Sequence, residues 1–442
     1  MRLQLIIVTV FLPLFAFTIP GKDDWRGRAD DPSIVHRTMK RITDVIVYDV
    51  YSPPVASRTY AYIAVAGYEA ARNGYNSYLS LSGQLNQLTG LPQPGSDRSY
   101  SFSIAAAHAM LKVAQTMVIS EDSILVFDRQ LQKEWRSMGV PEAVLINSLQ
   151  YGEAVALHII KWAGGDMYKQ TRSYPKFDVD EEVSTWKPTA PAYMKAVEPH
   201  WNKIRPFLID SAQQFKPEPA VQFSTDSSSQ FFAFAKEVYL AGKNLSAEQV
   251  AIADFWDCNP FRMNVSGHVM FATKKISPGG HWININATAC EIVKADIMRS
   301  LESYACLAVT MADAFIICWD EKYRSRVIRP ETYINLYIEK DWIPILQTPP
   351  FPEYTSGHSV VSAAAAVILT KLFGEGFKYT DDTEQSFGLP ARNFNSFRQA
   401  AEEAAISRLY GGIHYMPAIK FGFNAGEKLG NHITRKLRTK GS

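Results

Sequence analysis

Cysteine is scarce in this sequence, which has four in 442 residues, namely Cys258, Cys290, Cys306 and Cys318. No two of them form a Cys-x-x-Cys pair, and their spacing is not that of a zinc site. No metal site and no particular disulfide can therefore be read from the cysteines. Cys306 and Cys318 fall in one apolar helical run, which favours buried free thiols.

Runs of one charge are also missing. Lysine and arginine total 46 against 44 aspartate and glutamate, which gives a net charge of +2, and neither a basic stretch nor an acidic tail stands out. Nucleic acid and membrane surfaces are therefore not favoured as partners. The sequence gives no indication of the oligomeric state.

Long apolar runs are missing beyond the N-terminus, where no stretch reaches the roughly 18 uncharged apolar residues that mark a membrane-spanning helix. At the N-terminus, Arg2 precedes an apolar run of 13 residues from Leu5 to Phe17. That run is too short to span a bilayer and is typical of a signal-peptide core. We expect residues 1–18 to be a signal peptide. The mature chain is then exported, periplasmic or secreted, and has no transmembrane span.

Strict alternation of apolar and polar residues, the pattern of a half-buried strand, is scarce throughout. Apolar residues make up 47% of the chain, enough for a large core, and they recur at helical spacing. The sequence therefore predicts an all-α fold, a large helical bundle. Because 442 residues exceed one ordinary domain, we expect an N-terminal helical region at 30–245 and a C-terminal one at 246–437.

Start and stop signals place the individual helices. Two helices are expected within residues 36–73, split at Pro53-Pro54, and others at 101–119 and 141–165, with Ser120 as a cap between these two. Residues 168–222 are rich in proline, tryptophan and charge and predict a long irregular connection. Helix is expected again at 245–261, capped by Ser246, and at 288–322, with a loop over 274–282.

Three clusters near the C-terminus each lie at an expected helix boundary. The first has Lys322 at a helix end, with Arg329 after six further residues and just before Pro330. In the second, Ser356-Gly357-His358 stand where a proline-rich loop meets an alanine-rich helix. In the third, Arg408 ends a helix and is followed after five further residues by His414.

These residue types suit one task, which is to hold an oxyanion. The guanidinium groups of Arg329 and Arg408 can each bind two oxygens, and Lys322 adds a compact charge. A glycine at the first turn lets backbone N–H groups approach a ligand closely, and the positive end of the helix points the same way. His358 and His414 could ligate, attack or carry a proton.

The ordered set resembles the superfamily of vanadium-dependent haloperoxidases and type 2 phosphatidic acid phosphatases. The family pattern is Lys-x6-Arg-Pro, then Pro-Ser-Gly-His, then Ser-Arg-x5-His. Here it stands as Lys322 to Pro330, Ser356 to His358, and Ser407 to His414, with all three internal spacings in agreement. The expected export and lack of membrane spans favour the exported bacterial chloroperoxidase-like branch over the membrane-bound phosphatases.

The resemblance implies a role for each matching residue. It makes His414 the axial ligand of the vanadium in a vanadate cofactor. It makes His358 an acid–base group in halide oxidation by hydrogen peroxide, and it has Lys322 polarise the peroxide. The residues expected to bind the vanadate oxygens are Lys322, Arg329, Ser356, Gly357 and Arg408. Trp319 and Phe351 look like the aromatic residues that line the substrate side of chloroperoxidase-type sites.

The sequence departs from the family pattern in its supporting residues. Thr355 replaces the proline before the Ser-Gly-His triplet, and no aspartate follows His414 where the phosphatases have one. The acid expected to support the other histidine is matched by Asn259, with Asp257 two residues away. Two alternatives therefore stay open. One is an exported acid phosphatase whose small-molecule substrate is a phosphate ester, with its phosphate bound in the same pocket and transferred to His414 as a phosphohistidine. The other is an oxyanion-binding scaffold without turnover.

Overall fold

The computed structural model describes residues 25–266 and 269–441, and it describes no side chains over 264–272. The predicted signal peptide, residues 1–18, lies outside the described residues. The helices of the first half are α1 (Trp25–Ala29), α2 (Ser33–Tyr48), α3 (Pro53–Arg72), α4 (Phe102–Met117), α5 (Glu121–Ser137), α6 (Glu142–Gly164), α7 (Tyr168–Thr171) and the 3₁₀ turn η1 (Trp201–Lys203). Those of the second half are α8 (Gln230–Lys243), α9 (Ala247–Phe255), α10 (Pro278–Ile292), α11 (Ile297–Ser325), α12 (Pro330–Tyr337), α13 (Gly357–Phe373), the 3₁₀ turn η2 (Thr383–Phe387), α14 (Phe397–Tyr410) and α15 (Met416–Lys436).

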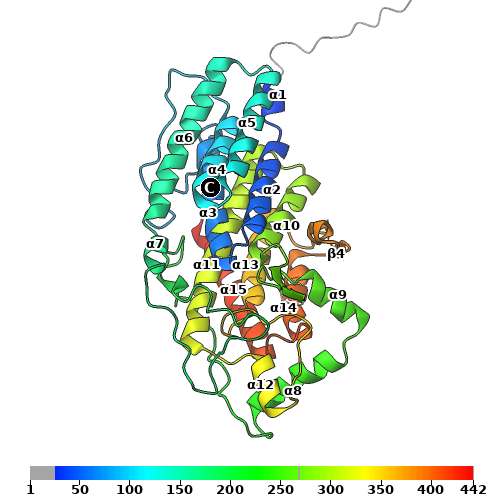
Figure 1. The fold of residues 1–442 in the computed structure, drawn as a ribbon. Helices are drawn as coiled ribbons and strands as arrows, with labels where there is room; N and C mark the ends of the chain where they lie inside the picture. The colour runs from blue at the N-terminus through cyan, green and yellow to red at the C-terminus, as the bar shows by residue number, and fades with distance from the viewer. Residues whose placement is uncertain (1–24, 267–268, 442) are drawn as a thin grey trace, which may run out of the picture.

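The bundle is built around the long helix α11, which packs against α3 on one side and α13 on the other. Figure 1 shows α1, α5 and α6 toward the top of the molecule, α13–α15 below them and α8 and α12 at the bottom. Helix α3 also packs on α4, which packs on α6, while α13 packs on α14 and α15. The three clusters of the sequence all fall in the half that contains α11–α15.

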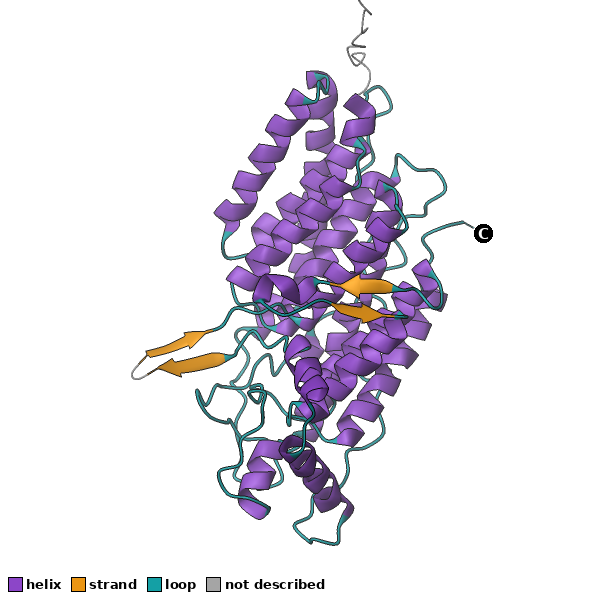
Figure 2. Ribbon diagram, turned by 90° about the vertical axis from the view of Figure 1, so that its right-hand side faces the viewer, coloured by secondary structure: helices purple, strands orange, loops and turns teal. Residues whose placement is uncertain are grey.

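The all-α prediction is confirmed, with two small additions that the sequence analysis did not foresee. Strands β1 (Met263–Ser266) and β2 (Val269–Ala272) form one antiparallel hairpin, and β3 (Tyr379–Asp381) and β4 (Arg392–Phe394) form another. The first hairpin projects from the helical body (Figure 2). Strands of three or four residues are too short to show a clear alternating pattern, which is why they escaped detection.

Most expected helix boundaries lie within a few residues of those observed, and three details were wrong. The single helix expected at 288–322 is interrupted, because α10 ends at Ile292 and Asp296 caps a new helix, α11. Ser120 precedes α5 but makes no cap bond, because its hydroxyl donates to Asp49 Oδ1 at 2.5 Å instead. The expected loop at 274–282 ends early, because Ser277 caps α10 and Pro278 occupies its first position. A serine followed by proline is a helix start, and this signal outweighed the two glycines that follow.

Two helices, α6 and α11, are long and apolar enough to cross a membrane by length and composition alone. The apolar window of α11 is wholly buried inside the bundle, as befits its central helix, and 44% of the corresponding window of α6 is buried. Buried helices of this kind also occur in the cores of proteins that span no membrane. The expected absence of a membrane span therefore stays a prediction.

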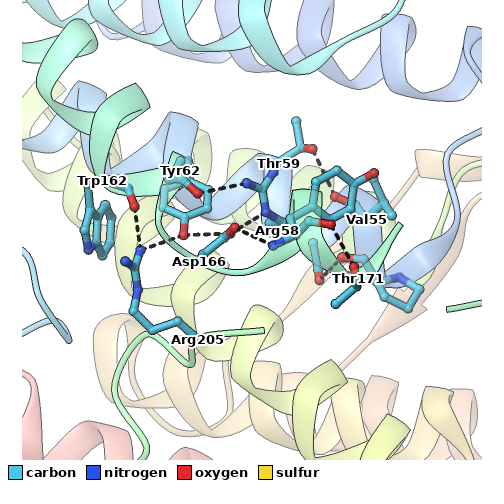
Figure 3. A network of polar contacts seen from close by, with 12 residues as sticks. Val55, Arg58, Thr59, Tyr62, Trp162, Asp166, Thr171 and Arg205 are labelled. Atoms are coloured by element: carbon cyan, nitrogen blue, oxygen red, sulfur yellow. Dashed lines mark hydrogen bonds and ion pairs between the residues drawn. The ribbon is translucent and has the colours of Figure 1, made fainter. Parts of the chain in front are cut away.

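A buried polar network anchors the start of α3 to the junction of α6 and α7 (Figure 3). Arg58 donates to Asp166 Oδ2 at 2.5 Å, and the hydroxyl of Tyr62 donates to the same oxygen at 3.0 Å. Arg205 donates in turn to the Tyr62 oxygen at 2.9 Å and to the Trp162 carbonyl at 3.0 Å. Each buried charge in the network has an opposite partner, as burial requires.

Close contact between α13 and α15 depends on glycine. A Cβ added at Gly426 would overlap the backbone carbonyl of Val360 on α13. A Cβ at Gly430 would come within 2.8 Å of Val367 Cβ. The absence of side chains at these two positions lets the backbones approach and fixes the start of α13, where the Ser-Gly-His triplet lies.

Candidate active site

The start of α13 forms one wall of the candidate site. Ser356 is the N-cap in extended conformation, and its hydroxyl accepts the N–H of Ser359 at 3.3 Å. Its own N–H donates to the Ala418 carbonyl at 3.1 Å, which ties the loop to α15. The peptide bond between Tyr354 and Thr355 is cis. The N–H groups of Gly357 and His358 belong to the first turn, which has no intrahelical acceptors for them.

His414 is held at both ring nitrogens. Its Nδ1 lies 2.8 Å from Glu353 Oε1, and its Nε2 lies 3.2 Å from Arg329 Nη1. Because arginine can only donate, Nε2 must carry the lone pair and Nδ1 the proton that is donated to Glu353. Burial lowers the pKa of His414 well below its usual value, and the charges of Arg329 and Lys322 lower it further. His414 is therefore a neutral imidazole with a defined tautomer.

Arg329 is completely buried between the second and third clusters. Its Nε donates to the Phe351 carbonyl at 2.9 Å and its Nη1 to the Ile413 carbonyl at 2.8 Å. Its Nη2 atom has no hydrogen-bond partner among the described residues. Burial lowers the pKa of Arg329 to about 10, so the side chain keeps its charge at neutral pH.

Lys322 lies below the rings of two aromatic residues. Its Nζ donates to the carbonyls of Pro352 at 2.9 Å and Glu353 at 3.0 Å, which leaves one of its three N–H groups. The Nζ atom is 5.0 Å from the ring centre of Phe351 and 5.8 Å from that of Trp319. Burial lowers the pKa of Lys322 to about 7, so its charge changes near neutral pH.

Arg408 and His358 meet at the carbonyl of Trp256. Arg408 donates to that carbonyl at 2.7 Å and to the Ser407 hydroxyl at 2.9 Å. His358 also hydrogen-bonds the Trp256 backbone, and its Nε2 atom is buried without a partner among the described residues. Burial and the charge of Arg408 lower the pKa of His358 well below its usual value. The ring is therefore neutral, with Nε2 free to accept a proton.

A narrow pocket joins these groups. Its volume is about 30 Å³, which is room for about two water molecules. Six of the predicted site residues line it, namely Trp319, Phe351, Gly357, His358, Arg408 and His414. The other three lie directly behind this lining: Arg329 contacts His414, Lys322 lies beside Phe351, and Ser356 precedes Gly357.

The acid that supports His414 comes from a position that the sequence analysis overlooked. Glu353 lies three residues before Ser356 in the loop that leads into α13, and only 1% of its surface is exposed. Burial raises its pKa to about 7, although Arg329 and Lys322 lower it. The signal was present in the sequence as a single carboxylate in an otherwise apolar and proline-rich loop, "PPFPEYTSGH".

The acid that was expected beside His358 is engaged elsewhere. Asp257 pairs with Lys275 at 2.8 Å and Arg262 at 3.2 Å. Asn259 donates to the Gln347 carbonyl and accepts the N–H of Phe261. Both residues line the pocket, and neither makes a hydrogen bond to His358 in the part of the chain that the structure describes.

A wider cleft adjoins the pocket at Phe261, which borders both. This cleft has a volume of about 720 Å³. Its lining comes mostly from the turn between α2 and α3, from α7 and from the irregular connection after α7, including Tyr51, Tyr168 and Lys195. The long connection predicted over 168–222 therefore has a place in the molecule as a wall of the approach to the site.

Comparison with known proteins agrees with this geometry. Residues 336–440 match the family model of the VCPO second helical-bundle domain. The chain is similar to the crystal structure described as the first bacterial vanadium-dependent iodoperoxidase, with 46% identity over 93% of this chain and 98% of that one and a TM-score of 0.88. No curated protein sequence matches the chain.

Two further structures share the fold at much lower identity. They are the holo and apo forms of a bacterial vanadium-dependent chloroperoxidase, each 15% identical over 88% of this chain with a TM-score of 0.66. The matched regions cover 94% of the holo chain and 96% of the apo chain. The 46% identity, which extends over nearly the whole length of the iodoperoxidase chain, shows that this chain belongs to the vanadium-dependent haloperoxidase family.

Proposed function

We propose that the chain is a vanadium-dependent haloperoxidase, which oxidises a halide with hydrogen peroxide at a vanadate held by His414. The observation that carries this proposal is an excess of buried positive charge around one small pocket. Lys322, Arg329 and Arg408 are all at most 1% exposed. The buried acids near them are Glu353 and Asp257, and Asp257 already pairs with two other cations. Buried charges need partners, and a bound oxyanion would supply the missing negative charge.

Unsatisfied donors give a second test of the fit. Arg329 Nη2 is buried without a partner among the described residues, and the N–H groups of Gly357 and His358 begin a helix. Leaving such groups unpaired costs about 1–3 kcal/mol each. Vanadate oxygens accept hydrogen bonds, so the residues present suit this cofactor. A phosphate would fit the same donors, so the choice between the two rests on the family and on the experiment below.

The residues that would hold vanadate follow from the contacts. Nε2 of His414 carries the lone pair that would bind the vanadium, once the Arg329 N–H that it now accepts turns to a vanadate oxygen. Glu353 keeps the proton on the other ring nitrogen. Arg329, Arg408 and the N–H of Gly357 would donate to vanadate oxygens, and Lys322 and Ser356 stand next to this lining. When bound, vanadate would supply a Lewis-acidic centre that activates hydrogen peroxide toward attack by a halide.

His358 is placed to carry the proton. A hydrogen bond to the Trp256 backbone engages one ring nitrogen, which leaves Nε2 as an acceptor inside the pocket. An anion nearby would offset the charge of Arg408 and raise the pKa of His358 toward neutrality. The ring could then accept a proton from hydrogen peroxide and return it to a leaving water.

We propose iodide as the first halide to test, because the structure with 46% identity is described as an iodoperoxidase. Trp319 and Phe351, whose ring centres are 4.9 Å apart, would form the wall at which the halide arrives.

We also propose that the chain is exported, with its N-terminal segment as the signal. The apolar run from Leu5 to Phe17 supports this proposal.

The deciding experiment compares two activities of one preparation. The chain is purified, treated with vanadate, and assayed for iodide and bromide oxidation with hydrogen peroxide. The vanadate-free chain is assayed for hydrolysis of a chromogenic phosphate ester. We expect vanadate-dependent halide oxidation and little ester hydrolysis. Ester hydrolysis that vanadate inhibits, without halide oxidation, would establish the phosphatase, and vanadate binding with neither activity would establish the scaffold.

A matched pair of histidine variants assigns the site. His414→Ala should abolish vanadate binding and halide oxidation together, because it removes the nitrogen that would bind the vanadium. His158→Ala serves as the control. His158 lies on α6, and its Nε2 hydrogen-bonds the Thr89 carbonyl. Vanadate binding that survives unchanged in His414→Ala would refute the assignment.

A further inference from the structure

A second cluster of ligating side chains lies behind the wall of the pocket. Cys258 Sγ, His281 Nδ1 and Glu384 Oε1 all lie within 4.8 Å of one another. The three residues come from the loop after α9, from α10 and from η2, and each is at most 2% exposed. Cys258 also lines the pocket, so the cluster touches the site without being part of its oxyanion cradle.

One of these ligand atoms is incompletely satisfied. Glu384 Oε1 is buried and lies 3.4 Å from His281 Nδ1, which makes an ion pair when the imidazole is protonated. It has no shorter hydrogen bond in the part of the chain that the structure describes. A buried carboxylate oxygen with one long contact keeps part of its desolvation cost, and a cation between the three side chains would remove that cost.

The histidine is oriented as a metal ligand would be. His281 Nε2 lies 2.8 Å from Asp381 Oδ2, and Asp381 in turn accepts the N–H of Thr383 at 3.0 Å. The ring is stacked on Trp256 with ring centres 4.5 Å apart. A carboxylate on one nitrogen with the other directed at a metal is the usual arrangement around protein-bound zinc. Nδ1 is thereby directed at Cys258 and Glu384.

Two of the three separations between the ligand atoms fit a zinc ion. Tetrahedral zinc with Zn–S of about 2.3 Å, Zn–N of about 2.05 Å and Zn–O of about 2.0 Å requires S···N and N···O separations of about 3.5 and 3.3 Å. The observed separations are 3.5 Å from Cys258 Sγ to His281 Nδ1 and 3.4 Å from Nδ1 to Glu384 Oε1. One thiolate, one imidazole and one carboxylate also form a ligand set of the softness that zinc prefers.

We propose that Cys258, His281 and Glu384 bind one Zn²⁺, with a water molecule as the fourth ligand. Zinc at this place fixes the loop 257–261, which lines the oxyanion pocket, to α10 and η2. The metal-free alternative is a protonated His281 between Asp381 and Glu384. Zinc binding to that state releases the second imidazole proton and the Cys258 thiol proton, so about two protons leave as one Zn²⁺ enters.

Zinc content tests the proposal without reference to vanadate or halide. The full chain is treated with a chelator, equilibrated with Zn²⁺ in excess, freed of unbound metal by gel filtration and analysed by mass spectrometry. We expect about one zinc per chain, and calorimetry in two buffers should show about two protons released. A wild-type chain that retains no zinc overturns the proposal, whatever its haloperoxidase activity.

Cobalt substitution tests the ligands. Co²⁺ in place of Zn²⁺ should give the wild-type chain a thiolate-to-cobalt charge-transfer band. Cys258→Ser should lose that band, and Glu384→Gln should lose most of the zinc. Cys290→Ser is the matched control, because its buried thiol lies 3.2 Å from the Ser303 hydroxyl, outside the cluster. A wild-type chain without the band, or a Cys258→Ser chain that keeps it, refutes thiolate ligation even if other variants fail to fold.

Discussion

Glu353 Oε1 lies 2.8 Å from His414 Nδ1, and the same oxygen accepts the N–H of Tyr415 at 2.9 Å. Because Arg329 donates to Nε2 of the same ring, this contact sets which nitrogen of His414 faces the pocket with its lone pair. Glu353 thus takes the place of the aspartate that the phosphatase pattern has after the last histidine. It comes from the loop before the Ser-Gly-His triplet and not from the segment after His414.

Glu353→Gln should weaken vanadate binding by about 10–100-fold, because partners that orient a metal ligand contribute on that scale. The glutamine side chain can still accept the hydrogen bond from His414 Nδ1. It lacks the negative charge that keeps the proton on that nitrogen. Vanadate titrations of the apo chain measure the effect. Glu69→Gln is the control, since Glu69 is another buried carboxylate and bonds Ser80 and the Leu81 N–H instead. Equal affinities of Glu353→Gln and wild type would exclude this role.

Vanadate binding should weaken as pH rises above about 7, and Lys322 should be one cause. Its pKa of about 7 in the folded chain means that it is charged below this pH and neutral above it. An anion favours the charged form, so above pH 7 binding must take up a proton. The ratio of the Kd of Lys322→Met to that of wild type should be largest below pH 7 and fall by up to about tenfold per pH unit above it.

Titration of vanadate itself cancels in that ratio. Its pH dependence then reports Lys322 together with Glu353, whose pKa the Lys322 charge lowers. The measurement is a series of vanadate titrations between about pH 6 and 9, with circular dichroism to verify that Lys322→Met is folded. A ratio that does not change with pH would mean that Lys322 keeps one protonation state throughout.

Arg329→Lys should weaken vanadate binding by about 10–150-fold, the equivalent of one charge-assisted hydrogen bond at about 1.5–3 kcal/mol. Lysine keeps the charge but loses the planar fork that bonds Phe351, Ile413 and His414 at once and leaves Nη2 for the ligand. Arg326→Lys is the control, because Arg326 lies at the end of α11 and pairs with Asp180 at the surface. Similar losses in both variants would argue against a specific role.

Asp166→Asn should lower the free energy of unfolding by about 3–5 kcal/mol, because it leaves Arg58 buried without a counter-charge. Arg58 and Asp166 are 8% and 1% exposed. Asp180→Asn removes the partner of Arg326 in an exposed pair and should cost much less, because solvent screens such a pair. Urea denaturation compares the two variants. A loss no larger in Asp166→Asn than in Asp180→Asn would show that the Arg58 charge is relieved by other means.

Gly426→Ala should destabilise the chain by about 1–3 kcal/mol, because its methyl group would overlap Val360 and push α15 away from α13. The same change at Gly164 should be neutral or stabilise by about 0.4–1 kcal/mol, because a Cβ there meets nothing within 4 Å. Thermal unfolding measures both variants. Since α13 carries the oxyanion-binding turn, we also expect weaker vanadate binding in Gly426→Ala alone.

The sequence by itself determined the all-α class, most helix boundaries and the residues of the oxyanion pocket. Proline, glycine and serine punctuate the helices through local backbone preferences, and the three motifs keep fixed spacings along the chain. Both the helix signals and the motif spacings are local along the chain, so they can be recognised from the sequence without a structure. The two hairpins were missed because short strands owe their conformation to their partners and not to their own pattern.

Only the tertiary structure decided which residues support the site. Glu353 and His414 are 61 residues apart, and Cys258, His281 and Glu384 come from three separate segments. No local pattern joins such residues, because their contacts arise from the packing of α11, α13 and α15 and of α10 beside them. The structure also decided the charge states. Burial, which the sequence does not specify residue by residue, brings the pKa of Lys322 to about 7 and keeps both site histidines neutral.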